Sequence, residues 1–305
     1  MWDNALNYFY EAAKRGSMRL ASEKIGVAVS SISRQISQLE RTFGMSLIEP
    51  GRRSIKLTEA GKLVFEFHRK QLTDRESLVN QLQELRDVKT GRVVLGIGEG
   101  FMGDAFAGTI AQFHRQNPGI EIVIDSGPSA QIVRMVLEDD VHIGMILHVT
   151  DEPKVRTRLA VKEPLMVLCA PDHPAAELQS VSLNTLAEYQ LCLPPQGFRI
   201  RAILAQAEHR ARTALEPMLV TTSIQMMRDV AKAGNVVTVL PRISALAELA
   251  DGSLVARPLL DAELEDSTVS LIHRLGRQLN GAPARLLSLL ENNLKSWTLP
   301  DAERE

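Results

Sequence analysis

Two short helical patterns joined by a glycine turn constrain the fold of this chain more than any other feature. Residues 18–25 and about 29–43 each repeat apolar residues at helical spacing, and Gly26 lies in the turn between them. Ser17 is placed to cap the first of these helices. A further helical pattern over residues 3–15 precedes them. Two apolar-faced helices joined by so short a turn predict a helix-turn-helix.

The outer faces of the second helix carry serine and arginine side chains. Its apolar face holds Ile32, Ile36, Leu39 and Phe43, and its other faces hold Ser30, Ser33, Arg34, Ser37 and Arg41. Arginine supplies bidentate charged donors, and serine hydroxyls donate to phosphate oxygens without bulk. These side chains suit a DNA backbone. The alternative is a solvated three-helix domain with scattered charge.

A basic β-wing is predicted directly after these helices. Two β-prone pieces within residues 45–58 flank a turn at Pro50–Arg53, which ends in two adjacent arginines. The charge balance agrees with a nucleic-acid partner. Residues 1–62 carry ten Lys and Arg against six Asp and Glu, a net +4, whereas residues 63–305 carry 25 against 31, a net −6. A small basic part on an acidic body indicates that only the first part meets a polyanion.

The composition is that of a globular protein of two or three domains. Hydrophobic residues make up 45% of the 305 residues and charged residues 24%, which excludes a largely disordered chain. Apolar runs such as 164–171 are far shorter than the ~20 residues of a membrane-spanning helix, and the N-terminus lacks a signal-peptide pattern. Cys169 and Cys192 lie in apolar stretches, which predicts two buried free thiols. We therefore expect a cytoplasmic protein that makes no membrane contact.

A second helical stretch is predicted from Thr58, its cap, to about residue 88. It is a polar rod with an apolar seam formed by Leu63, Phe67, Leu78, Leu82 and Leu85. A long exposed helix with such a seam usually pairs with a partner helix. The alternative is that it packs against its own body.

From residue 92 the pattern changes to alternating strands and helices. Strands are predicted at 92–97, 120–125 and 141–147, with helices at 105–116 and 131–138 between them. This alternation predicts an α/β domain with a mainly parallel sheet.

The first strand-to-helix turn of this region reads Gly98-Glu-Gly-Phe-Met-Gly103. It matches the dinucleotide-binding pattern G-x-G-x-x-G, and Asp125 lies near the place of a ribose-binding acid. The alternative function is therefore a dinucleotide-dependent oxidoreductase with an N-terminal helix-turn-helix. Glycine is also favoured at any strand-to-helix turn beside a ligand cleft, so the motif alone is a weak signal.

Several motifs resemble those of LysR-type transcriptional regulators. The N-terminal signature is the stretch Gly16–Glu40, continued by Gly44–Ile48 and Leu57–Gly61. The downstream matches are Asn117–Ile120, Ala170–Pro174, Ser182–Leu186 and Val230–Pro241. The resemblance covers essentially the whole chain.

The resemblance implies a winged helix-turn-helix, a linker helix, and a two-lobed α/β effector domain like periplasmic binding proteins. The expected limits are 1–60 for the DNA-binding domain, 61–89 for the linker and dimerisation helix, 90–163 with 269–305 for lobe one, and 164–268 for lobe two. It also implies double-stranded DNA and a small-molecule effector as partners, and a homodimer or homotetramer. We expect no catalytic residue, no metal and no cofactor, and hence no enzyme.

The resemblance places two sets of functional residues. Those expected at DNA are Val29, Ser30, Ser31, Ser33, Arg34, Arg52 and Arg53. Those expected around the effector, between the lobes, are Gly98, Glu99, Gly100, Phe101, Ser129, Leu147, His148, Phe198, Thr222 and Ser223. For Ser129 and Ser223 the alternative is an ordinary helix cap.

The chain departs from the family pattern at both sites. Ala28 and Val29 stand where the family has Ser-Gln at the start of the recognition helix, and Val29 can only touch a thymine methyl. Glu99 replaces a hydroxyl residue at the expected cleft and would repel a ligand carboxylate placed close by, unless a cation such as Arg199 swings in. We therefore predict that the effector presents a neutral or cationic donor to Glu99. The alternative is that Glu99 points into solvent and caps its own helix.

Overall fold

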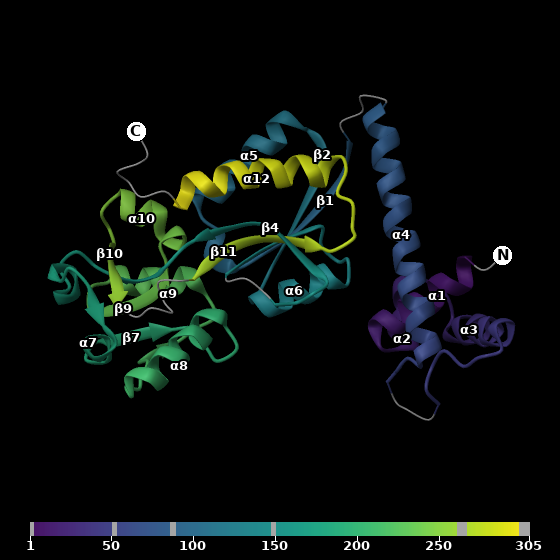
Figure 1. Cartoon of the computed structure of the whole chain (residues 1–305), viewed down its shortest axis with the longest axis horizontal. Helices are drawn as coiled ribbons and strands as arrows, with labels where there is room; N and C mark the ends of the chain where they lie inside the picture. The colour runs from purple at the N-terminus through teal and green to yellow at the C-terminus, as the bar shows by residue number, and fades with distance from the viewer. Residues whose placement is uncertain (1–2, 51–53, 86–89, 148–150, 261–266, 299–305) are drawn as a thin grey trace. The chain divides into compact units, whose positions relative to one another are not determined.

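The computed structural model describes residues 3–50, 54–85, 90–147, 151–260 and 267–298. The chain divides into two compact units, residues 1–79 and 80–305, and each is described by itself. Figure 1 shows the order of the elements along the chain.

The N-terminal unit is built from four helices. They are α1 (Asp3–Arg15), α2 (Met18–Ile25), α3 (Val29–Phe43) and α4 (Glu59–Leu85). Phe9, Ile32, Ile36, Leu39 and Leu47 are buried together in its core. Because apolar residues recur every three or four positions in α1 and α3, these two helices bury one stripe and leave their polar faces in solvent.

The turn between α2 and α3 has the predicted chemistry. Ser17 caps α2 by accepting a hydrogen bond from the backbone N–H of Leu20. Gly26 adopts φ +77°, a left-handed conformation that glycine reaches without a Cβ clash. The Ser22 hydroxyl then donates to the carbonyl of Val27 at 2.6 Å and fixes the chain before α3.

The base of the wing is held by α3 and α4. Ile48 and Leu57 form an antiparallel bridge, and the Glu40 carboxylate accepts from the Leu47 N–H at 2.7 Å. Thr58 caps α4 as predicted, because its hydroxyl accepts from the Gly61 N–H at 3.0 Å. A Cβ at Gly61 would lie 2.0 Å from the Leu47 carbonyl oxygen, so only glycine lets α4 approach the wing here. The wing tip, 51–53, lies outside the described residues.

The C-terminal unit contains two β-sheets. Sheet one has the strand order β2-β1-β3-β11-β4, formed by β1 (Thr90–Ile97), β2 (Gly119–Ser126), β3 (Ile143–Leu147), β4 (Val155–Lys162) and β11 (Thr268–Arg274). Sheet two has the order β6-β10-β5-β9-β7-β8, formed by β5 (Leu165–Cys169), β6 (Val181–Ser182), β7 (Gln190–Leu193), β8 (Leu219–Val220), β9 (Val236–Pro241) and β10 (Val255–Leu260).

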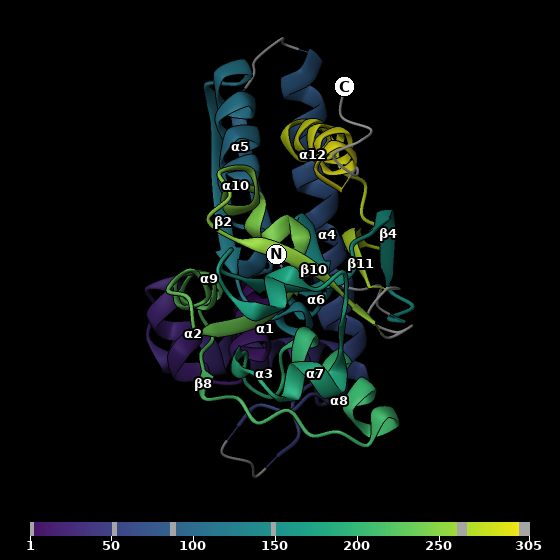
Figure 2. The same ribbon diagram turned by 90° about the vertical axis from the view of Figure 1, so that its left-hand side faces the viewer.

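Helices cover both sheets. Around sheet one lie η1 (Glu99–Phe101), α5 (Asp104–Gln116), α6 (Ser129–Leu137) and α12 (Ala282–Thr298). Around sheet two lie η2 (Pro174–Glu177), α7 (Leu183–Ala187), α8 (Arg199–Ala211), α9 (Ile224–Lys232), η3 (Arg242–Ala245) and α10 (Leu246–Ala250). In sheet one, α5 and α12 lie on the same face and α6 lies on the other (Figure 1, Figure 2). Accordingly Leu95 of β1 packs in the same cluster as Phe113, whereas its neighbour Val94 packs with Ile132 of α6.

Both sheets are mixed, which refines the prediction of a mainly parallel sheet. The three strands expected from the sequence, β1, β2 and β3, do pair in parallel. The returning strand β11 pairs antiparallel with β3 and with β4. The alternation of strands and helices up to residue 147 predicts the parallel part, but it carries no information about a strand that returns about 120 residues later.

The chain passes between the sheets twice. It leaves sheet one between β4 and β5 and returns between β10 and β11. The two passages are hydrogen-bonded to one another, because the Glu163 N–H donates to the Ser267 carbonyl at 2.8 Å and the Ser267 hydroxyl donates to the Glu163 carbonyl. The Glu163 carboxylate also accepts from the Ile243 N–H of η3.

The two cysteines are buried and free, as predicted. Burial raises the pKa of the Cys169 thiol to about 11 and also raises the pKa of Cys192. Neither side chain therefore supplies a reactive thiolate near neutral pH. Among the described residues, no helix is long and apolar enough to cross a membrane.

Candidate functional site

The outer face of α3 exposes most of the residues predicted to contact DNA. Ser30, Ser31, Ser33 and Arg34 are exposed, and Val29 is 42% exposed. Arg34 makes no hydrogen bond or ion pair with any described residue, so its guanidinium is available to an external anion. Ala28 is the N-cap residue of α3, and its side chain makes no capping hydrogen bond to the N–H groups of the first turn. Arg52 and Arg53 lie outside the described residues.

A small cavity lies between the elements of the two sheets and gathers most of the predicted effector residues. Its volume is about 50 Å³. The predicted residues that line it are Gly98, Glu99, Gly100, Phe101, Ser129, Leu147 and Phe198. Thr222 and Ser223 do not line it, although the next residue, Ile224, does. His148 lies outside the described residues.

Glu99 connects the two sides of this cavity. It lies in η1, directly after β1 of sheet one, and its Oε1 accepts a hydrogen bond of 3.2 Å from the N–H of Ile224. Ile224 is the first residue of α9, which belongs to sheet two. The alternative that Glu99 caps its own helix is therefore wrong, because this carboxylate caps a helix of the other lobe.

The two serines have different roles. Ser223 caps α9 by accepting from the Met226 N–H at 3.3 Å, so the alternative of an ordinary cap is confirmed for it. Ser129 does not cap α6; its hydroxyl donates to the Leu147 carbonyl at 3.4 Å, within the cavity lining.

Several lining residues escaped the sequence reasoning. They are Gly127, Pro128, Ile200, Ile224, Pro241 and Ser244. Arg199, expected from the sequence only as a cation that could swing in beside Glu99, also lines the cavity. Ile224 directly follows the predicted Ser223 in the sequence. Ser244 lies in η3 and no motif marks it.

The protein's own side chains fill the space beside two of the three glycines in the glycine-rich turn, whereas the space beside Gly103 is open. Added Cβ atoms at Gly98 and Gly100 would lie 3.1 Å from the Phe101 ring and 3.0 Å from the Ser244 Oγ. A dinucleotide fingerprint instead requires open space so that a pyrophosphate can approach the backbone. α5 begins only after Gly103, with the short turn η1 in between.

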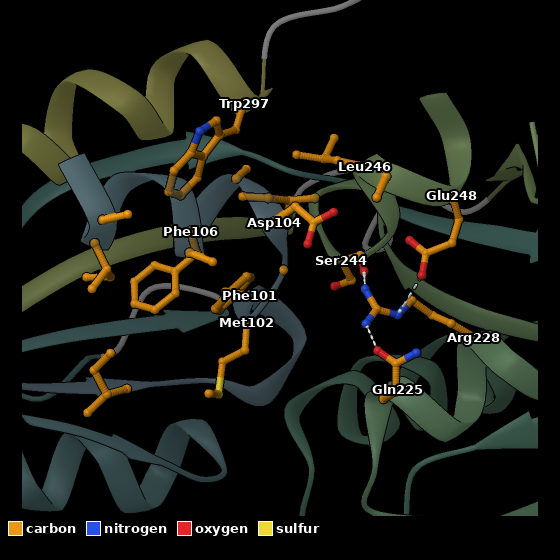
Figure 3. A pocket seen from close by; sticks show the side chains of 18 of the residues that line it. Phe101, Met102, Asp104, Phe106, Gln225, Arg228, Ser244, Leu246, Glu248 and Trp297 are labelled. Atoms are coloured by element: carbon orange, nitrogen blue, oxygen red, sulfur yellow. Dashed lines mark hydrogen bonds and ion pairs between the residues drawn. The ribbon is translucent and has the colours of Figure 1, made fainter. Parts of the chain in front are cut away.

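A larger cavity of about 860 Å³ lies between α5, β2, α9 and α10 (Figure 3). Of the predicted effector residues only Phe101 lines it. On one side it is closed by Arg228, which donates to the Ser244 carbonyl and to the Gln225 side chain and pairs with Glu248 at 3.3 Å (Figure 3). The opposite side is apolar, with Phe106 and Trp297.

The described residues contain no group of three or more His, Cys, Asp or Glu that could hold a metal ion. His142 is buried in the core, where its Nδ1 accepts from the Val94 N–H at 2.8 Å. Its role is structural.

Family models match both parts of the chain. The model described as "Bacterial regulatory helix-turn-helix protein, lysR family" matches residues 4–62, and "LysR substrate binding domain" matches residues 86–295. The chain belongs to the LysR family of transcriptional regulators. It is thus a regulator with a DNA-binding helix-turn-helix and an effector-binding domain, and not an enzyme. The alternative of a dinucleotide-dependent oxidoreductase is not supported.

Curated relatives match most of the length of this LysR-type chain. The "Transcriptional dual regulator GltC" of Bacillus subtilis (strain 168) is 27% identical over 277 residues, 90% of this chain and 91% of the relative. The "HTH-type transcriptional regulator BenM" of Acinetobacter baylyi is 25% identical over 272 residues, 85% of each chain.

Solved structures share the fold. A full-length OxyR variant from Pseudomonas aeruginosa aligns with a TM-score of 0.64 at 20% identity, covering 97% of this chain and 95% of that one. Full-length CbnR complexed with its target DNA aligns with a TM-score of 0.53 at 18% identity, covering 96% of this chain and 99% of that one.

Proposed function

We propose that this regulator binds its operator through the outer face of α3 and the wing. The observation that carries the proposal is the exposed row of hydroxyls beside Arg34, a guanidinium with no partner among the described residues. Arg34 and the serines supply phosphate contacts, and Val29 supplies an apolar contact to a thymine methyl. The wing arginines, Arg52 and Arg53, complete the predicted contact set.

We further propose that a small effector binds in the cleft between the lobes, in the cytoplasm where the operator lies. The residues predicted for it are supported by their convergence on one cavity. Two hydrogen-bonded passages join the sheets at Glu163 and Ser267, so a ligand that favours one spacing of the lobes can shift their arrangement. The domain limits expected from the sequence, with lobe one at 90–163 and 269–305, belong to this proposal, as does assembly into a homodimer or homotetramer.

Fluorescence anisotropy with a labelled duplex of mixed sequence tests the DNA contact. Arg34→Ala should weaken binding at every salt concentration, and the slope of log K against log salt should fall by about 0.9 for one lost phosphate contact. Arg75→Ala is the matched control, because Arg75 is exposed on α4 and also has no partner among the described residues. Equal affinity and equal salt slope for Arg34→Ala and wild type would show that α3 does not contact the phosphates.

A further inference from the structure

The proposed effector cleft already contains one anion of the protein itself. The Glu99 carboxylate occupies the N-terminus of α9 through its bond to the Ile224 N–H, which is where a ligand carboxylate would otherwise find free donors. The bond uses Oε1, and no described residue donates to Oε2. A ligand group beside Glu99 therefore meets a negative charge, and the Oε2 atom can still accept a hydrogen bond from it.

The same cleft contains an arginine without a partner. Arg199 is the first residue of α8 and lines the cavity, yet it makes no hydrogen bond or ion pair with the described residues. Its Nε is buried from solvent and unsatisfied. The residue before it, Phe198, cannot cap α8. Arg199 is partly exposed as a whole, so only its buried Nε is left without an acceptor, and an acidic ligand group entering here would supply one.

The remaining lining is apolar. It consists mainly of Phe101, Leu147, Phe198, Ile200, Ile224 and Pro241. A volume of about 50 Å³ leaves space for only a few water molecules. A ligand larger than this has to displace part of the lining between Glu99 and Arg199.

We propose that the effector is a small zwitterion with an apolar body, such as an amino acid, whose acid group pairs with Arg199 and whose ammonium pairs with Glu99. This inference rests on the proposed function of the cleft as the effector site. A simple acid leaves Glu99 facing a like charge, and a simple amine leaves Arg199 unpaired. Only a molecule with both groups satisfies both sides of the cleft.

Isothermal titration calorimetry on the full chain tests this with matched probes. L-leucine, β-leucine and 4-aminobutyrate place the two charges at different spacings, while 4-methylpentanoate and 3-methylbutylamine carry the acid or the amine alone. We expect at least one zwitterion to bind ten-fold or more tightly than both single-charge probes. Binding of no zwitterion, or an acid that binds as tightly, overturns the inference.

Charge variants separate the two ends of the ligand. Glu99→Gln should weaken zwitterion binding at least ten-fold and raise the affinity for 4-methylpentanoate relative to the amine. Arg199→Gln should weaken zwitterion binding and raise the affinity for 3-methylbutylamine relative to 4-methylpentanoate. Arg199→Lys should keep the order of affinities that wild type shows among the probes. The controls Glu188→Gln and Arg134→Gln change exposed charges away from the cavity and should leave every affinity as in wild type. Thermal unfolding followed by circular dichroism checks that each variant is folded.

The variants also distinguish this inference from the proposed function beneath it. If 4-methylpentanoate binds wild type as tightly as a zwitterion and only Arg199→Gln weakens it, the cleft is the effector site but the zwitterion is wrong. If a probe binds equally to wild type and to both charge variants, it binds elsewhere, and the proposed cleft site fails with the inference.

Discussion

At the scale of single residues, Arg228 shows how a buried charge is held in the effector-binding unit. It is 9% exposed, as is Glu248, and the two form an ion pair supported by the Ser244 carbonyl and the Gln225 amide oxygen. A buried pair of this kind adds little net stability, but the loss of one partner leaves an uncompensated charge.

The first prediction concerns this pair. Arg228→Met should lower the free energy of unfolding by about 3 kcal/mol, because Glu248 then keeps only the more distant Lys232, at 4.0 Å, as a counter-charge and the hydrogen bonds of Arg228 are lost. The double variant Arg228→Met/Glu248→Met should recover most of that loss. Urea unfolding followed by circular dichroism measures both, and a double variant as unstable as the single one would show that the charges are not coupled.

The second prediction concerns the buried His273. Burial lowers its pKa, and the charges of Arg158, Arg156 and Arg277 lower it further, against a hydrogen bond to the Arg274 carbonyl. The folded chain therefore binds a proton here at lower pH than the unfolded chain, whose His titrates near ~6.5. The contribution of the neutral His273 to the free energy of unfolding is fully present above about pH 6.5. It is lost as the pH falls below about 6.5, because the unfolded state then binds more protons at this residue than the folded state.

Thermal unfolding between about pH 7.5 and 5 tests this, with His273→Gln as the variant. The variant should lose less stability on acidification than wild type, and its melting temperature should fall less steeply with pH. His209→Gln is the control, because His209 is exposed on α8. Equal slopes for wild type and His273→Gln would contradict the assignment.

At the scale of elements, α4 carries an apolar seam whose described side chains are exposed. Leu63, Phe67, Leu78 and Leu82 are all exposed, with Leu82 at 51% and Leu63 at 74%. The side chain of Leu85 lies outside the described part of the helix. The exposure of the other four residues supports the proposal that α4 pairs with the same helix of another subunit.

The third prediction follows from that seam. Leu82→Glu should lower the mass measured by light scattering, because a charge in a helix–helix interface is desolvated without a partner. Gln81→Glu adds the same charge at the neighbouring exposed position and should keep the wild-type mass. An unchanged mass for Leu82→Glu would place the subunit interface elsewhere.

The elements are also where sequence reasoning works best and where its limit appears. The helices around Gly26 and the strands before residue 147 follow from local periodicity and turn chemistry, and the structure confirms them. The Glu99–Ile224 bond joins residues 125 positions apart, and no local pattern encodes such a contact. Likewise, the role that we propose for Arg199 follows only from the cavity that it lines together with residues from other elements.

At the scale of the whole molecule, the chain combines a basic helix-turn-helix unit with an acidic effector-binding unit. The first carries the exposed recognition helix, and the second carries a cleft whose two sides are tied by Glu99. Burial raises the pKa of both cysteines, so neither offers the reactive thiolate that sensing by thiol oxidation requires. The signal that we propose for this chain is therefore a bound molecule, and the response is a change in how it holds DNA.

The central claim is that α3 reads a DNA sequence, and selection from a library of random duplexes by the full chain tests it most directly. Wild type should enrich one motif built of two related half-sites, since two copies of α3 in a symmetric dimer meet two copies of the sequence. Ser33→Ala/Arg34→Ala should enrich no such motif, or bind it at least ten-fold more weakly in anisotropy titrations. The account is contradicted if wild type enriches no common sequence, or if the α3 variant selects the same motif with equal affinity.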